Sequence, residues 1–147
     1  MDYVWIKRPV YFITTCTQKR APLLANDTAH DLLLAEWQTA DTRHGWRIGR
    51  YVIMPDHVHF FCVALPEVKS LTKFMQCWKE WTAKRLLAAN QKPPPLWQHR
   101  FFDHVLRTPE SYAEKWSYVA QNPVRGGLAA MSDAWPYAGH VHFDSPM

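Results

Sequence analysis

The chain has 147 residues, of which 48% are hydrophobic and 20% are charged, and this balance excludes a disordered or fibrous protein. The length predicts a single domain over residues 1–147, and the longest apolar run, residues 60–65, is far shorter than the ~18 residues that cross a bilayer. The net charge of +4 permits a polyanionic partner without requiring one.

The N-terminal part of the chain predicts a strand followed by a helix. Residues 10–17 are rich in β-branched and aromatic side chains, which is typical of a strand. Asn26 or Asp27 can cap a helix whose apolar residues recur at helical spacing and which ends near Gly45. No charged-then-apolar leader opens the sequence, and the cysteines form no C-x-x-C pair. We therefore expect a cytoplasmic protein with no membrane partner and no disulfide framework.

A hairpin and a second helix follow. Residues 46–54 and 57–65 are strand-like runs separated by the turn dipeptide Pro55-Asp56, so we expect an antiparallel hairpin. Ser70 is a suitable N-cap for a helix whose apolar side chains recur as one buried stripe.

The last third of the chain predicts one more strand and one more helix. Residues 101–107 are strand-like, and Thr108 can cap a helix with Pro109 at its first position and Pro123 at its end. The order is then βαββαβ with an additional helix, which is the ferredoxin-like pattern. We therefore expect an α+β fold in which an antiparallel sheet carries helices on one face and is followed by an additional C-terminal helix.

Two histidines begin the second strand of the hairpin. His57 and His59 are two residues apart, so their side chains leave the same face of a strand. Imidazole is a common ligand for divalent metals, and a rigid pair can supply two ligands of an open site. The alternative is a pair of histidines on a solvated or packed strand face. Asp56 is expected as a turn residue, with a supporting contact to His57 as the alternative.

Polar side chains with helical spacing lie in the last predicted helix. Tyr118 and Asn122 are four residues apart and share a face, and Gln121 lies nearly as close to Tyr118. Tyr118 falls off the apolar stripe of this helix, which argues against a packing role alone. We expect a phenol and a carboxamide to point together, with an ordinary surface tyrosine as the alternative.

Three segments of the sequence resemble the REP-associated tyrosine transposases, which belong to the single-tyrosine HUH transposases. In the family's order, they are YVIMPDHVHF at residues 51–60, WQHRFFDHVLR at 97–107 and YVAQNPVRGGL at 118–128. The two histidines of the HUH motif bind a divalent metal in that family, and a tyrosine is the nucleophile. The resemblance therefore implies that His57 and His59 hold Mg²⁺ or Mn²⁺ and that Tyr118 attacks the substrate.

The resemblance also implies a reaction and a third metal ligand. The Tyr118 phenolate would attack a phosphodiester of single-stranded DNA, and reversal of the resulting 5′-phosphotyrosine link would rejoin strands. The metal would polarise the non-bridging oxygens, and neither a nucleotide cofactor nor a small-molecule substrate is expected. Asn122 matches the family's third ligand, but Pro123 biases its backbone away from helical geometry, so Gln121 remains a second candidate.

The family binds a repeat that folds as a DNA hairpin beside a short single-stranded guide. The resemblance therefore implies single-stranded or hairpin DNA as the partner of a nucleoid-associated protein, acting as a monomer or a homodimer. Unpaired bases could stack on Trp5 or Trp97, although core packing is the favoured role of each. The basic residues expected to contact phosphates are Lys7, Arg8, Lys19, Arg20, Lys79, Arg100, Arg107 and Arg125.

Two alternative functions stay open. A domesticated relative could bind hairpin nucleic acid as a catalytically silent regulator, although the intact His57, His59 and Tyr118 argue against such a loss. A metal-dependent phosphodiesterase could instead release a hydrolysed product, with Tyr118 in a structural role. A covalent adduct between protein and DNA distinguishes the transposase from both.

Overall fold

The computed structural model describes residues 9–66 and 68–145, so Trp5, Lys7 and Arg8 lie outside the described residues. The elements in chain order are β1 (Val10–Cys16), η1 (Gln18–Arg20), α2 (Asp27–Gln38), α3 (Ala40–His44), β2 (Trp46–Ile53), β3 (His57–Ala64), α4 (Leu71–Asn90), β4 (Phe102–Leu106), α5 (Pro109–Ala120), α6 (Asn122–Arg125), η2 (Ser132–Ala134) and β5 (Ala138–His140). The predicted βαββαβ order is confirmed, and the helices α5 and α6 follow it. Among the described helices, none combines the length and the hydropathy that crossing a membrane requires.

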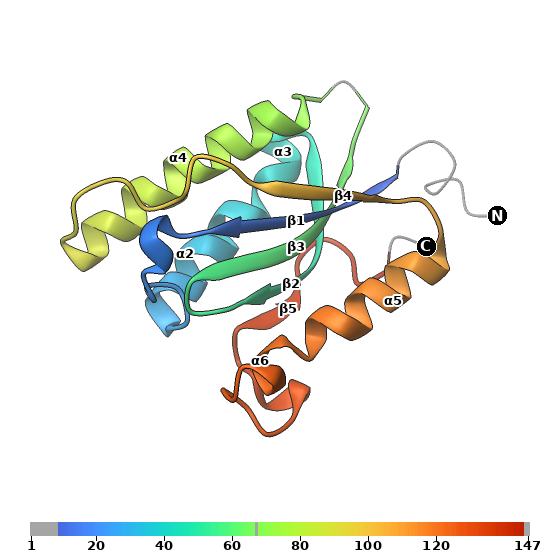
Figure 1. Ribbon diagram of the computed structural model, residues 1–147. Coiled ribbons are helices and arrows are strands. Elements are labelled where there is room, and N and C mark those ends of the chain that lie inside the picture. The colour runs from blue at the N-terminus through green and yellow to red at the C-terminus, as the bar shows by residue number, and fades with distance from the viewer. Residues whose placement is uncertain (1–8, 67, 146–147) are drawn as a thin grey trace.

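The strands form one antiparallel sheet in the order β4-β1-β3-β2-β5 (Figure 1). The first four strands of this order are those of the ferredoxin-like pattern, so the predicted α+β fold class is confirmed. β5 was not predicted from the sequence. It is a three-residue strand that pairs with the edge of β2, and such a short segment carries no readable alternation of apolar and polar residues.

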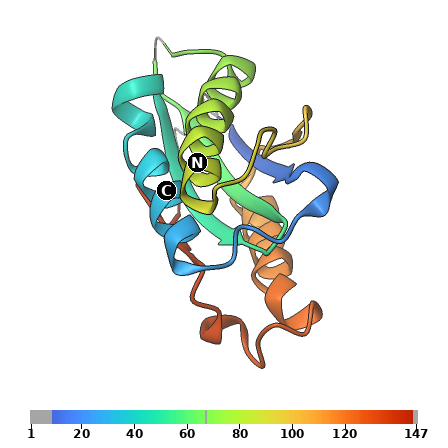
Figure 2. The same ribbon diagram turned by 90° about the vertical axis from the view of Figure 1, so that its left-hand side faces the viewer.

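Alternate residues of the central strands face opposite sides of the sheet, and each side has its own core. α2 and α4 cover one side, where Phe60 packs against Trp37 and Trp78 (Figure 2). α5 packs on the other side, where the ring of Tyr112 contacts Phe61. The predicted additional helix is therefore separated from the other long helices by the sheet.

The helix boundaries follow the predicted capping residues. The side chains of Asn26, Ser70 and Thr108 each accept a hydrogen bond from the backbone N–H three residues later. The helix predicted to run to Gly45 is broken at Thr39 into α2 and α3. Gly45 ends α3 with φ at +79°, and a Cβ there would lie 2.7 Å from a methyl carbon of Val68, so glycine suits this position.

Candidate active site

The β2–β3 hairpin places two histidines side by side at the start of β3. His57 pairs with Cys16 of β1 and His59 pairs with Thr14, and the two imidazole centroids are 4.8 Å apart. His59 also stacks on Phe12, with 5.2 Å between ring centroids, and Phe12 belongs to the core on the α5 side. The prediction that both imidazoles share one sheet face is confirmed.

Each imidazole is held through its Nδ1 atom. His57 Nδ1 lies 2.7 Å from Asp56 Oδ1, and His59 Nδ1 lies 2.8 Å from Thr14 Oγ1. Within residues 9–66 and 68–145, no hydrogen bond reaches either Nε2. Hydrogen bonding at one ring nitrogen fixes the ring and leaves the other nitrogen as the ligand atom, an arrangement typical of metal-binding histidines.

Asp56 links His57 to the turn after β1. Arg20 Nε donates to Asp56 Oδ2 at 2.8 Å. Burial alone would raise the pKa of Asp56, but the hydrogen bonds from Arg20 and His57 have the larger combined effect, so the pKa is lowered. Asp56 is therefore a carboxylate, and the supporting contact to His57 considered as an alternative is present. Lys19 and Arg20 both have left-handed backbones, with φ of 55° and 54°, a strained conformation for non-glycine residues.

His59 is kept neutral by its surroundings. Burial lowers its pKa to about 3, with smaller contributions from His57 and from the positive charges of Lys115 and Arg125. A neutral imidazole has a lone pair free for a metal, because protonation would block that nitrogen. The same pKa shift indicates that two cations from the C-terminal helices act on His59.

Tyr118 lies near the end of α5 with 65% of its surface exposed. α5 packs on the sheet through Tyr112 and Val119, so the prediction that Tyr118 lies off the packing stripe is confirmed. Arg125 covers the phenol: its Cζ atom is 4.0 Å from the ring centroid. Arg125 also donates to the Tyr118 carbonyl at 2.6 Å and to Asn122 Oδ1. The structure therefore brings the phenol and the carboxamide of Asn122 together through one guanidinium.

The two candidate third ligands sit at the junction of α5 and α6. Gln121 is the exposed C-cap of α5, and Asn122 is partly buried at the start of α6. The expectation that Pro123 moves Asn122 away from helical geometry is wrong. α6 is a new helical turn in which Pro123 occupies one of the first two positions, where its missing N–H is not needed.

The donor set fits a divalent metal only if it includes an amide, a phenol or the substrate. Among the residues that the structure describes, no group of three or more His, Cys, Asp or Glu side chains could hold a metal ion. The free Nε2 atoms of His57 and His59 supply two imidazole donors, and Asn122 or Gln121 can add a carboxamide oxygen. A mixed nitrogen and oxygen set with open positions suits Mg²⁺ or Mn²⁺ that also binds phosphate.

Sequence reasoning missed Thr14, Phe12 and Lys115 at this site. Thr14 and Phe12 contact His59, and Lys115 Nζ lies 5.2 Å from the centroid of the Phe12 ring. The two β1 residues are neighbours of His59 only because β1 pairs with β3, a relationship that a strand pattern alone does not specify. Lys115 is distant from the histidines in sequence and reaches them only through the packing of α5.

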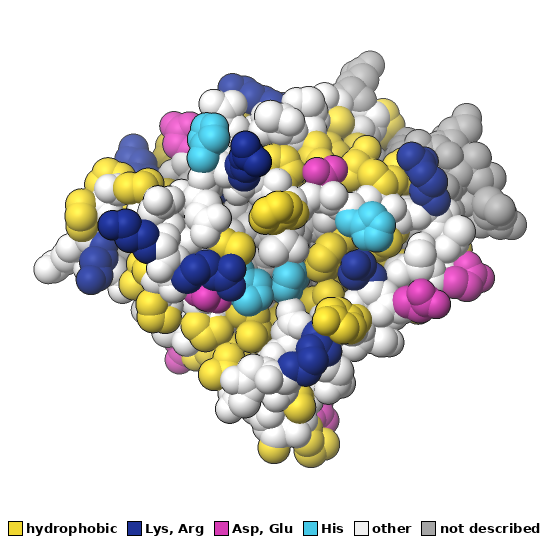
Figure 3. All heavy atoms as spheres, in the orientation of Figure 1, with side chains coloured by type: hydrophobic (Ala, Val, Ile, Leu, Met, Phe, Trp, Pro, Cys, Tyr) yellow, Lys and Arg dark blue, Asp and Glu magenta, His cyan; other side chains and the backbone are white. Residues whose placement is uncertain are grey.

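The predicted phosphate-binding cations take different positions. Lys19, Arg100, Arg107 and Arg125 are exposed. Figure 3 shows lysine, arginine and histidine side chains gathered over the face of β1, β3 and the C-terminal helices. Trp97, by contrast, is 6% exposed and its Nε1 donates to Thr82 Oγ1 at 2.9 Å, which confirms core packing.

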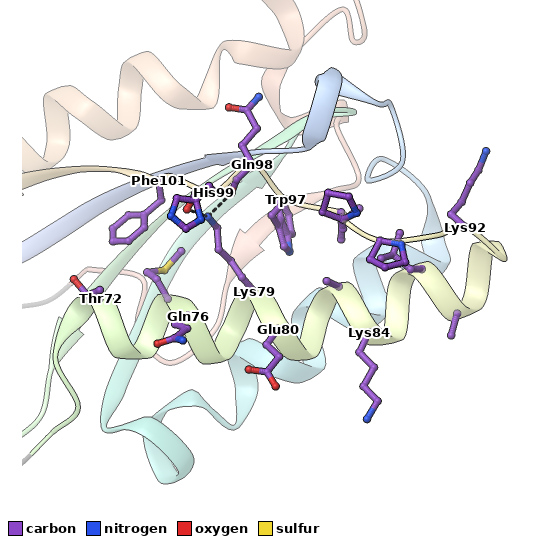
Figure 4. Close-up of a pocket in the computed structure, with 17 residues that line it drawn as sticks. Thr72, Gln76, Lys79, Glu80, Lys84, Lys92, Trp97, Gln98, His99 and Phe101 are labelled. Atoms are coloured by element: carbon purple, nitrogen blue, oxygen red, sulfur yellow. Dashed lines mark hydrogen bonds between the residues drawn. The ribbon is translucent and has the colours of Figure 1, made fainter.

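Lys79 points from α4 into a groove of about 900 Å³ between this helix and residues 92–101 (Figure 4). Its ammonium donates to the carbonyls of Gln98, His99 and Arg100 at 2.7, 3.3 and 3.0 Å. Burial lowers the pKa of Lys79. Neither His57 nor His59 lines this groove. The three hydrogen bonds of Lys79 attach α4 to the segment that leads into β4.

Comparison with known proteins shows the family of the chain and agrees with this fold. Residues 7–121 match the protein family described as Transposase IS200 like, so the chain belongs to the IS200-like transposase family. A REP-associated tyrosine transposase of Escherichia coli (strain K12) is 27% identical over 135 residues, covering 91% of this chain and 78% of the relative. A Haemophilus influenzae protein assigned to the same group is 27% identical over 142 residues, covering 90% of this chain and 80% of that protein. The resemblance to REP-associated tyrosine transposases is thereby confirmed.

A solved structure shares the fold. The structure of a REP-associated tyrosine transposase bound to a REP hairpin superposes with a TM-score of 0.72 at 22% identity, covering 88% of this chain and 75% of that chain.

Proposed function

We propose that this transposase cleaves and rejoins single-stranded DNA at hairpin-forming repeats, with Tyr118 as the nucleophile. The observation that carries the proposal is the exposed Tyr118 phenol on the same side of the sheet as His57 and His59, with Arg125 contacting the phenol and acting on His59. An exposed tyrosine on the same side of the sheet as two ligand-competent imidazoles is suited to phosphoryl transfer, because a phosphate bound on this face could meet both the nucleophile and the metal.

The substrate is proposed from the charge of this face and from the relatives. Exposed cations on the histidine face provide contacts for a phosphate backbone. The solved relative was bound to a REP hairpin, which supports a hairpin as the DNA structure recognised.

The chemistry requires one bond to form and one to break at phosphorus. Tyr118 Oη loses its proton and bonds to phosphorus, while the bond from phosphorus to the 3′ oxygen breaks and that oxygen gains a proton. The products are a 5′-phosphotyrosine and a free 3′-hydroxyl, and attack by a 3′-hydroxyl in reverse rejoins the strands. Mg²⁺ or Mn²⁺ held by His57, His59 and either Asn122 or Gln121 would offset negative charge on the non-bridging oxygens.

The other residues of the site position these groups. Asp56 and Thr14 orient the two imidazoles so that both Nε2 atoms are left for the ion. Arg125 restrains Tyr118 and Asn122 at the end of α5.

The test is adduct formation with a labelled DNA strand that carries a repeat hairpin from the host genome. Wild type with Mn²⁺ should give a labelled band that survives denaturation, and Tyr118→Phe should give none. Tyr137→Phe is a matched control, because Tyr137 hydrogen-bonds to Asp27 and packs on the opposite side of the sheet from His57 and His59. Cleavage by both wild type and Tyr118→Phe without an adduct would indicate a hydrolase. Binding without cleavage would indicate a silent regulator.

A further inference from the structure

Phe102, the first residue of β4, is an unusually exposed aromatic side chain. It is 65% exposed, as is Tyr118, and the other exposed aromatic among the described residues, Trp81, is only 37% exposed. The ring belongs to neither hydrophobic core, and neither the fold nor the proposed chemistry uses it.

The strand pairing puts Phe102 on the same face as the histidines. Thr14 of β1 pairs with His59 on one side and with Phe102 on the other. Directly opposed residues of antiparallel strands point to the same face, so His59, Thr14 and Phe102 form one row across the sheet. Two strand spacings of ~4.8 Å place the Phe102 backbone about 10 Å from that of His59. Phe101, the preceding residue, packs against the core on the opposite side, as alternation requires.

This part of the face is left uncovered by α5. α5 contacts β2 and shares a core with Leu106 at the end of β4, whereas Phe102 at the start of β4 is exposed. His104, next along the same face of β4, is also exposed and pairs with Phe12. An open surface therefore extends from the histidine pair to the edge of β4.

The surroundings of Phe102 favour nucleic acid over a protein partner. Arg100 and Arg107 are exposed just before and just after β4, and Lys115 lies over Phe12. The neighbours of Phe102 on its own face are Thr14 and His104, so the ring does not belong to a broad apolar patch of the kind that docks proteins. A single exposed ring among cations matches an unpaired nucleotide, whose base stacks while its phosphates are neutralised.

We propose that Phe102 is a stacking platform for an unpaired base of the DNA strand beside the cleavage site. This inference rests on the proposed function and adds a specific contact to it. By holding one base at the β4 edge, Phe102 directs the neighbouring backbone across Thr14 toward the histidine pair. Phe102 is thus a positioning residue that acts on single-stranded DNA and not on the duplex stem.

The test compares two labelled DNAs, a hairpin with single-stranded flanks and the same hairpin without them. Phe102→Ala and Phe102→Leu should weaken binding of the flanked hairpin by about 5- to 150-fold, the usual range for one base stacked on one aromatic ring. Phe102→Trp should retain binding because it keeps an aromatic surface. All three variants should bind the unflanked hairpin like wild type. Trp81→Ala is the matched control, because Trp81 is an exposed aromatic residue on α4, which covers the opposite face of the sheet from the Phe102 side chain.

Photo-crosslinking locates the base directly. 5-Iodouracil placed at successive flank positions should crosslink to Phe102 at one position, and mass spectrometry of the peptide identifies the residue. Binding and adduct formation by Phe102→Ala at wild-type levels would overturn the stacking role and leave the proposed function standing. Failure of wild type to bind or cleave the flanked hairpin would overturn both.

Discussion

The guanidinium of Arg125 lies over the ring of Tyr118, with 4.0 Å between Cζ and the ring centroid. The same guanidinium donates to the Tyr118 carbonyl and to Asn122 Oδ1, so one exposed side chain joins the last turn of α5 to α6. The oxygen that Asn122 would offer to a metal is thus already in contact with a cation. If Asn122 is the third ligand, metal binding would require Arg125 to release that oxygen, and the released guanidinium would then be free to face a phosphate.

Arg125→Ala should slow adduct formation by about 2- to 5-fold, because loss of an exposed cation–π contact of ~0.5–1 kcal/mol leaves the Tyr118 ring unrestrained. Arg125→Lys should have an intermediate rate, since it keeps the charge and loses the paired hydrogen bonds. The rate is measured by quenched time points at saturating DNA, which separates positioning from affinity. Lys84→Ala removes a cation that contacts Trp81 on α4 and serves as the control. Wild-type rates in Arg125→Ala would contradict a positioning role.

Asp56→Ala should weaken Mn²⁺ binding by about 10- to 100-fold, the usual effect of removing the partner that orients a ligating histidine. The reason is the 2.7 Å contact between Asp56 Oδ1 and His57 Nδ1, which fixes the ring. Asp56→Asn keeps an acceptor oxygen and should therefore weaken Mn²⁺ binding less than Asp56→Ala does. Calorimetric titration without DNA measures the affinity, and Asp133→Ala, an exposed acid in η2, is the control. Equal Mn²⁺ affinity in Asp56→Ala and wild type would show that Asp56 is only a turn residue.

The sequence predicts those parts of the site that depend on local geometry. The shared face of His57 and His59 follows from the two-residue period of a strand, and the exposure of Tyr118 follows from its place off the apolar stripe of α5. The contact of Thr14 with His59 depends instead on strand order, which a single-sequence pattern does not define. The contact of Arg125 with the Tyr118 ring depends on α6, a separate short helix that follows α5 and directs Arg125 back toward Tyr118.

The choice between Asn122 and Gln121 as third ligand is decided by removing each in turn. Asn122→Ala should weaken Mn²⁺ binding by about 10-fold or more, whereas Gln121→Ala should leave it unchanged. The physical reason is that Asn122 is partly buried and held beside Tyr118 through Arg125, while Gln121 is an exposed C-cap. Calorimetry on both variants gives the comparison within one experiment. The reverse pattern would assign the ligand to Gln121.

Lys79 and Arg107 should differ in the salt dependence of DNA binding, although both were predicted to contact phosphates. Lys79 already donates to three carbonyls, so Lys79→Met should lower the free energy of unfolding by about 1–3 kcal/mol and leave the salt slope unchanged. Arg107 is exposed beside β4, so Arg107→Ala should reduce the slope of log K against log salt by about 1 with little effect on stability. Chemical denaturation and binding at several salt concentrations measure the two effects. A reduced slope in Lys79→Met would instead show that the ammonium leaves its carbonyls to contact DNA.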